Sequence, residues 1–307
     1  MTTAIAGASG GDVLVSGEPS GQPSLGFDSA IRPITNPTLF DLPLTGTNVH
    51  PIMMYQRLPD FVNTTAGKVP MGGDVEVYAL QFEYAFNDRL SLVATKDGYV
   101  EIHPDTKPLW SKQSGFANLG AGLKYAFYYD PAARAAASAT VTFELPTGNH
   151  DVFQGEGSGA ANLTVSALKL WDGLELAGAA GVHLPFDDQS ATTSFASAHV
   201  SHEFCRWFIP LMEVNWYHVL ETGNGWANFF SQAGGAVPVI ATFEGSDLLN
   251  FGASNASQHR DLVTAAIGFR SRLSDRVEAG FAYELPVTSP HNGIIADRCT
   301  LDVVWKF

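Results

Sequence analysis

The chain has little cysteine. Only two cysteines occur among its 307 residues, and they do not form a C-x-x-C pair. Two cysteines cannot build a multi-bridge disulfide scaffold, and a structural zinc site needs more ligands at close spacing. The fold must therefore be held by packing and by backbone hydrogen bonds.

Basic residues are also scarce. Lys and Arg number 17 against 31 Asp and Glu, which gives a formal net charge of -14. A chain of this sign repels phosphate backbones, so nucleic acid is not an expected partner. Among nine histidines, His199 and His202 are three residues apart on an expected strand, where they face opposite sides. We predict no metal site and no cofactor.

Long hydrophobic runs are absent as well. No stretch of about 20 residues is continuously apolar, which excludes a helical membrane protein. The first residues lack the basic region and the apolar core of a secretory signal. We expect either a cytoplasmic protein or an exported one whose signal peptide is missing from this sequence, and the strand pattern favours the second.

The chain is rich in alternation with a period of two, which begins near residue 47 and is typical of strands with one face in an apolar medium. Between residues 78 and 86, large apolar side chains alternate with alanine, glutamine and glutamate. Similar alternation recurs to the C-terminus, and we count about twelve strands. They are centred near residues 52, 80, 95, 122, 140, 165, 178, 200, 213, 266, 281 and 302.

The links between these strands alternate between short and long. Short links lie near residues 87–89, 130–133, 172–173, 205–206 and 274–275, and long loops lie near residues 58–73, 103–114, 147–158, 185–193, 221–258 and 286–295. Short turns at one end and long loops at the other are typical of a bacterial outer-membrane barrel. A soluble β-sandwich is the alternative, but the second face of the strands is poor in lysine and rich in small polar residues, as in a polar lumen.

We therefore predict an all-β protein, an antiparallel up-and-down transmembrane β-barrel of about twelve strands. The barrel is expected over residues 46–307, and residues 1–45 form a non-regular N-terminal segment, flexible or acting as a plug. Both termini then lie at the periplasmic end, and the expected location is the bacterial outer membrane.

Aromatic residues support this orientation. They fall next to short links or the C-terminus and predict a periplasmic girdle of Phe86, Tyr129, Trp171, Phe204, Trp207 and Trp305. The terminal Phe307 shares a face with Leu301, Val303 and Trp305, which resembles the signal read by the barrel-assembly machinery. We expect that machinery, outer-membrane lipid and lipopolysaccharide as partners, and the pattern leaves the oligomeric state open.

Several phrases of the sequence resemble a known family. They are FEYAFNDRLSL at 82–92, GFRSRLSDRVEAG at 268–280, ELPTG at 144–148 and ELPVT at 284–288. Residues 70–307 are similar to the outer-membrane family labelled meta-pathway of phenol degradation. This resemblance implies transport of hydrophobic or aromatic compounds. The N-terminal region resembles, more loosely, the lumen-filling hatch of long-chain fatty acid transporters.

Charged residues on the second face are the candidate pore lining. Alternation places Glu83, Lys124, Glu213, Arg270 and Asp302 in the lumen. A mixed-sign ring could form a constriction that selects solutes. The same charges could instead close the lumen through mutual ion pairs, because twelve strands enclose a narrow interior. Both interpretations stay open.

The N-terminal segment contains an apolar stretch, residues 31–44. A free tail does not expose as much apolar surface as this stretch carries in Ile31, Ile34, Leu39 and Phe40. This stretch either enters the lumen as a plug or remains a periplasmic tail that packs loosely or binds a partner.

The predicted function is passive diffusion of small, hydrophobic or aromatic solutes through an outer-membrane channel, without a catalytic step. One alternative is a closed barrel with a structural or partner-binding role through its long loops, of which 221–258 is the longest. A third possibility is a lipid-modifying enzyme. That would require a serine, a histidine and a carboxylate or amide on adjacent strands near a leaflet, and the neighbours Ser201 and His202 face opposite ways.

Overall fold

The computed structural model describes residues 26–64, 67–105, 111–155, 157–188, 190–223, 227–229, 235–237 and 259–307. No helix within these ranges is long and apolar enough to cross a membrane. The described elements are β1 Asn48–Arg57, β2 Phe61–Thr64, β3 Gly67–Pro70, β4 Gly73–Ala85, β5 Leu90–Lys96, β6 Tyr99–Pro104, β7 Gln113–Phe116, β8 Leu119–Asp130, β9 Ala135–Leu145, the 3-10 turn η1 His150–Val152, β10 Ala160–Leu170, β11 Leu174–Pro185, β12 Thr192–His202, β13 Ile209–Glu221, β14 Ala227–Phe229, β15 Gly235–Val237, β16 Asp261–Arg272, β17 Val277–Pro286, η2 Pro290–Asn292 and β18 Asp297–Lys306.

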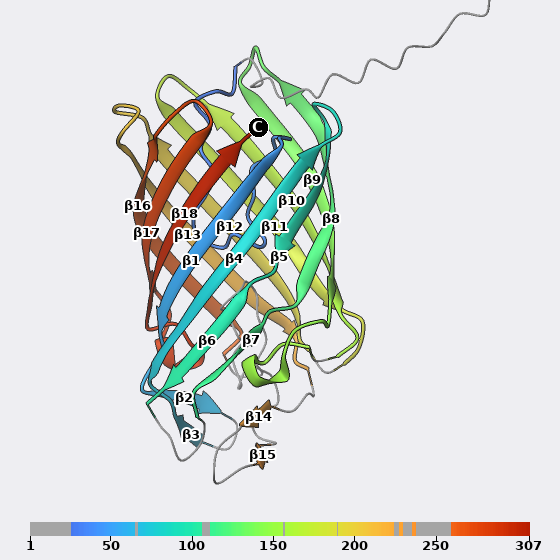
Figure 1. The fold of residues 1–307 in the computed structure, drawn as a ribbon, viewed down its shortest axis with the longest axis vertical. Helices are drawn as coiled ribbons and strands as arrows, with labels where there is room; N and C mark the ends of the chain where they lie inside the picture. The colour runs from blue at the N-terminus through green and yellow to red at the C-terminus, as the bar shows by residue number, and fades with distance from the viewer. Residues whose placement is uncertain are drawn as a thin grey trace, which may run out of the picture.

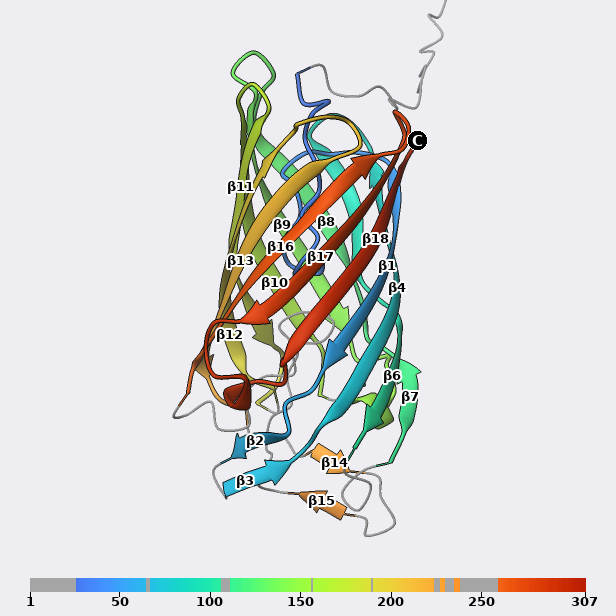
Figure 2. The same cartoon turned by 90° about the vertical axis from the view of Figure 1, so that its left-hand side faces the viewer.

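The main sheet closes on itself into a barrel (Figures 1 and 2). Strand β1 pairs with the last strand, β18, on one side and with β4 on the other. Fourteen strands belong to this sheet. Strands β5 and β6 both pair with β4, so together they fill one barrel position. Strand β8 pairs with β5 and strand β7 pairs with β6, so β7 and β8 together fill the next position. Fourteen strands in twelve positions confirm the predicted antiparallel twelve-stranded barrel.

The two faces of the wall differ as the alternation predicts. On β4 the side chains of Val75 and Val77 are buried inside, whereas those of Leu80 and Phe82 are 51% and 46% exposed outside. Comparable exposed apolar side chains lie on the outer face of β8, β9, β10, β11, β13, β16, β17 and β18. Such a surface is stable only when a bilayer covers it, so the chain is a transmembrane β-barrel.

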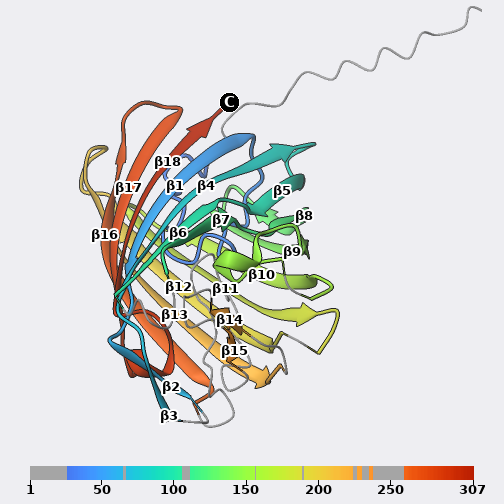
Figure 3. The same cartoon turned by 60° about the horizontal axis from the view of Figure 1, so that its bottom comes forward.

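The two ends of the barrel also differ. Short turns lie at the end that carries the C-terminus, at the top of Figures 1 and 2. The hairpins β2–β3 and β14–β15 and the turns η1 and η2 belong to the long connections at the other end, which Figure 3 brings forward. Most of the loop 221–258 lies outside the described residues.

One aromatic residue differs from its predicted position. Phe86, Trp171, Phe204, Trp207 and Trp305 are exposed on the outer wall near the short turns. Tyr129, by contrast, points into the barrel, and its ring centroid lies 5.2 Å from that of Phe27. The reason is an irregularity between Tyr125 and Tyr128, where the register against β9 shifts. Strict alternation is interrupted there, so the predicted place of Tyr129 in the girdle is wrong.

Candidate functional site in the barrel lumen

The lumen contains part of the chain itself, residues 26–46, which we call the lumen segment. It enters beside the β8–β9 turn, where the guanidinium of Arg134 donates to the carbonyl of Gly26 (3.2 Å). It leaves beside the β4–β5 turn, where Thr45 Oγ1 donates to the carbonyl of Asn87 (3.1 Å). Figure 2 shows this blue trace inside the ring of strands. Both ends of the lumen segment therefore lie at the short-turn opening.

The apolar residues predicted as a plug all lie inside the barrel. Ile31 and Ile34 have no exposed surface, Phe40 is 1% exposed and Leu39 is 6% exposed. Phe40 and Leu39 pack with Leu168, Leu170 and Phe195 of the wall. Ile31 and Ile34 pack with Ile209 and Leu211 of β13. Of the predicted N-terminal segment, residues 1–25 lie outside the described residues.

Glu213 of β13 binds the lumen segment at Ile34 and Thr35, a place that we call its inner turn. Its carboxylate accepts the main-chain N–H groups of Ile34 (2.9 Å) and Thr35 (2.7 Å), and also the Thr35 hydroxyl. His199 Nδ1 lies 2.8 Å from the same carboxylate. All four groups are buried. Because hydrogen bonds to a charged group are stronger than neutral ones, Glu213 is a strong anchor.

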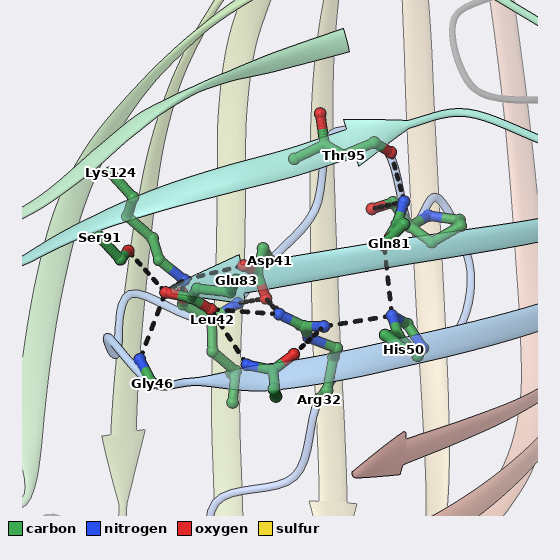
Figure 4. Close-up of polar contacts among 12 residues, drawn as sticks. Arg32, Asp41, Leu42, Gly46, His50, Gln81, Glu83, Ser91, Thr95 and Lys124 are labelled. Carbon is green, nitrogen blue, oxygen red and sulfur yellow. Dashed lines mark hydrogen bonds and ion pairs between the residues drawn. The ribbon is translucent and has the colours of Figure 1, made fainter. Parts of the chain in front are cut away.

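A second anchor is a cluster of alternating charges, which Figure 4 shows in close-up. Arg32 Nε donates to Asp41 (2.9 Å), so the lumen segment is bridged within itself. Lys124 of β8 bonds Asp41 (2.8 Å) and Glu83 of β4 (2.9 Å). The Arg32 guanidinium also reaches Glu83 (3.4 Å). Two cations and two carboxylates thus neutralise each other in the interior, as buried charges must.

These charges also fix the ionisation of Asp41. Burial raises the pKa of this carboxyl, but the charges of Arg32 and Lys124 outweigh burial and hold the pKa below its ordinary value of 3.8. Asp41 is therefore an anion at every physiological pH.

A third anchor lies on β16, β18 and β1. Asp302 accepts from Arg270 (2.8 Å) and lies 2.7 Å from His50 Nε2. Arg270 Nε in turn donates to the carbonyl of Arg32 (3.1 Å). The wall thus reaches the backbone of the lumen segment through an arginine that a carboxylate holds in place.

Three further wall side chains, together with Lys124, bind the backbone of the lumen segment. Glu175 accepts the N–H of Ile31 (2.9 Å), and Arg272 donates to the carbonyl of Ser29 (2.6 Å). Gln81 donates to the carbonyl of Pro37 (3.1 Å), and Lys124 donates to that of Leu42 (3.1 Å). Carboxylates meet N–H groups and cations or amides meet carbonyls, so the polarity of wall and segment is complementary throughout.

The five predicted pore-lining residues, Glu83, Lys124, Glu213, Arg270 and Asp302, all face the interior and are at most 4% exposed. The structure brings Glu83 and Lys124 into one cluster and Arg270 and Asp302 into another, while Glu213 stands apart. Sequence reasoning missed Arg32, Asp41 and Glu175. An arginine and an aspartate within an otherwise apolar stretch were the available signal for the first two.

Within the part of the chain that the structure describes, one group of side chains could hold a metal ion. Ligand atoms of Asp74, Glu76 and His103 lie within 4.8 Å of one another. They belong to the outer face near the long-loop end, where His103 Nδ1 is 2.9 Å from Asp74. Oxygen and imidazole ligands suit several divalent cations. Glu101 and Lys112 already form ion pairs at this edge, and the cluster has no contact with the lumen segment.

The comparisons with known proteins agree with this architecture. The sequence profile of the family described as "Putative MetA-pathway of phenol degradation" matches residues 55–254. No curated protein matches the chain. Among solved structures, the COG4313 outer membrane channel from Pseudomonas putida F1 is similar with a TM-score of 0.58 and 14% identity, covering 91% of this chain and 100% of that one. The NanC porin has a TM-score of 0.49 at 6% identity (85% and 100% covered), and the KdgM porin 0.44 at 8% (84% and 99%).

Proposed function

This chain belongs to the family described as MetA-pathway of phenol degradation, and on that basis we propose that it is an outer-membrane channel for the passive diffusion of small hydrophobic or aromatic solutes. The apolar outer wall and the short-turn and long-loop ends support the outer-membrane location. The family description supports the aromatic class of solute. The similar structure from Pseudomonas putida is itself named an outer membrane channel.

We further propose that the lumen segment closes this channel at rest. The observation that carries the proposal is the way in which the lumen is filled. Side chains of the wall fill the interior of a barrel of about eight strands, and the interior widens as strands are added. Here a separate stretch of chain lies in the interior, and hydrogen bonds and ion pairs hold it there. The lumen segment can leave the lumen without any change in the barrel wall.

Single-channel conductance in a planar bilayer tests both parts. The full chain is measured beside a chain lacking residues 1–45 and beside the Glu213→Ala variant, which keeps the segment but removes its inner anchor. We expect small or rare conductance steps for the full chain and steady steps for both variants. Folding of each protein is checked by its heat-modifiable migration on gels.

Other outcomes separate the alternatives. Steady conductance of the full chain at the level of the variants would refute closure by the lumen segment but keep the channel. Silence of all three folded proteins would refute the channel and favour the closed barrel with a structural or partner-binding role. The solute class is tested by liposome influx, where benzoate should enter the open variants faster than a neutral sugar of similar size.

A further inference from the structure

Three polar residues form one row across the outer wall, far from the lumen site. Ser194 of β12 lies directly opposite His218 of β13, and His218 lies directly opposite Asp261 of β16. The buried inner row at Ser197, Asn215 and Thr264 is in register in the same way. Each residue of the first row is three positions from its inner counterpart: Ser194 and Asp261 precede theirs, and His218, on the antiparallel middle strand, follows Asn215. Because strand side chains alternate, the first row faces outward.

The histidine of this row has the geometry of an oriented base. His218 Nδ1 lies 2.8 Å from Asp261 Oδ1. A carboxylate can only accept, so Nδ1 carries a proton, and in the neutral imidazole Nε2 then has the lone pair. Trp216 Nε1 donates to the same oxygen of Asp261 (2.8 Å) and so fixes the carboxylate. The centroids of the Trp216 and His218 rings are 5.6 Å apart, which limits rotation of the imidazole.

The serine is within reach of that base. Side chains directly opposite on antiparallel strands have Cβ atoms about 4.5–5.5 Å apart. A rotation about the first side-chain torsion of Ser194 can therefore bring Oγ to Nε2. Serine, histidine and aspartate follow one another on three neighbouring strands, in the spatial order of nucleophile, base and orienting carboxylate of a hydrolytic triad. Such contacts commonly tighten only when substrate binds.

The surroundings of the row are lipid-facing. It lies close to the long-loop end, where β12 begins and β13 ends. Its neighbours on the outer wall are apolar: Trp216 is 39% exposed and Leu220 is 44% exposed. An ionisable pair that faces lipid is costly, which makes it a candidate functional site. Ester carbonyls of membrane lipids lie at this level, between the apolar chains and the head groups.

We propose that Ser194, His218 and Asp261 form a lipid-facing catalytic triad that hydrolyses carboxylic ester bonds of membrane lipids. Ser194 Oγ attacks the ester carbonyl carbon while its proton passes to His218 Nε2. The ester C–O bond then breaks, and the leaving alkoxide takes that proton. Water next attacks the acyl-Ser194 ester, giving its proton to His218, and the fatty acid leaves as Ser194 regains a proton. Asp261 stabilises the imidazolium at both stages.

Fatty-acid release from phospholipid–detergent micelles tests this proposal. The full chain is purified from a host strain that lacks its own outer-membrane phospholipase. We expect release that Ser194→Ala abolishes and that His218→Asn lowers by at least about 100-fold, the usual contribution of a general base. A fluorophosphonate probe should label Ser194, and mass spectrometry of the labelled peptide identifies the site.

Two matched variants control for changes in the outer wall. Ser114→Ala removes another outward serine, which bonds Tyr99 rather than a histidine. His202→Asn removes another outward histidine, which packs on Phe204 at the opposite end of β12. Both should keep full release. Absence of release and of labelling in the folded protein would overturn the proposal, as would release that survives Ser194→Ala. Neither result bears on the channel, because conductance is measured separately.

Discussion

Lys124 of β8 and Asp41 of the lumen segment are joined by a 2.8 Å ion pair, although 83 residues separate them in the sequence. This pair connects the barrel wall to the chain that fills it. Most of the predictions below concern such contacts, because they determine whether the lumen segment stays in place.

Lys124→Met should loosen the lumen segment. The substitution leaves Arg32 as the one cation beside the carboxylates of Asp41 and Glu83, and breaking a buried pair in this way costs up to about 3–5 kcal/mol. We expect a higher open fraction in planar bilayers and a lower urea midpoint. Lys306→Met is the control, because the Lys306 side chain is 43% exposed and its pair with Glu278 should contribute less than about 1 kcal/mol.

The contact of Asp41 should resist mild acid. A group whose pKa is lowered on folding contributes stability above its unfolded pKa, and this stability is lost only as pH falls through the folded value. Since Asp41 starts from 3.8 and is lowered further, the difference in conductance between the wild type and Asp41→Asn should be constant from pH 7 to about pH 5. A difference that vanishes near pH 6 would show that Asp41 does not hold the lumen segment.

Glu213→Gln should expose the inner turn to solvent exchange. The variant loses the charge and one acceptor oxygen that hold the N–H groups of Ile34 and Thr35. Hydrogen bonds to charged groups contribute about 1.5–3 kcal/mol, so the two amides should exchange roughly 10- to 100-fold faster. Hydrogen–deuterium exchange with mass spectrometry measures this. Glu76→Gln on the outer face should leave both rates unchanged.

A charged side chain on the outer wall should destabilise the folded barrel by an amount that depends on its depth in the membrane. Ile267 is 62% exposed near the middle of β16, so Ile267→Arg should cost about 2–4 kcal/mol in lipid. Val287, which follows the end of β17, is 67% exposed, and Val287→Arg should cost about 0–1 kcal/mol. Equal costs in urea titrations of lipid-embedded protein would contradict the membrane orientation.

Deletion of Phe307 tests its predicted role as an assembly signal. The ring stacks on Trp305 at 5.6 Å, and the Phe307 N–H donates to the Thr47 carbonyl (3.0 Å). If the residue is mainly a signal, the deletion variant should refold in detergent nearly as well as the wild type but accumulate poorly in outer membranes of cells. Equal loss in both assays would assign Phe307 a purely structural role.

The sequence was informative where alternation is unbroken. All twelve predicted strand centres fall within barrel positions, because residues of the two faces alternate along each strand. It failed where alternation is interrupted. The irregularity before Tyr128 reversed the face of Tyr129. The break between β5 and β6 was missed although Asp97-Gly98 marks it, because a single strand was expected near residue 95.

The sites depended on information that a single sequence lacks. Lumen charges could be assigned to a face, but their partners in the lumen segment could not, since a non-regular chain has no period. The row of Ser194, His218 and Asp261 depends on the register between strands, which local residue types do not determine. A triad on adjacent strands was the stated requirement for an enzyme, but the pair named from the sequence, Ser201 and His202, adjoins along one strand, whereas the structure places Ser194 opposite His218 on two.

The lumen segment enters and leaves by the same opening, and this has a mechanical consequence. A pull on the chain before Gly26 would load its contacts one after another: first Arg134, then Arg272 and Glu175, and only later Arg270, Glu213 and Lys124. Bonds loaded in sequence yield at a lower force than bonds loaded together. The lumen segment can therefore be removed one contact at a time through the short-turn opening, and no residue has to pass through the whole length of the barrel.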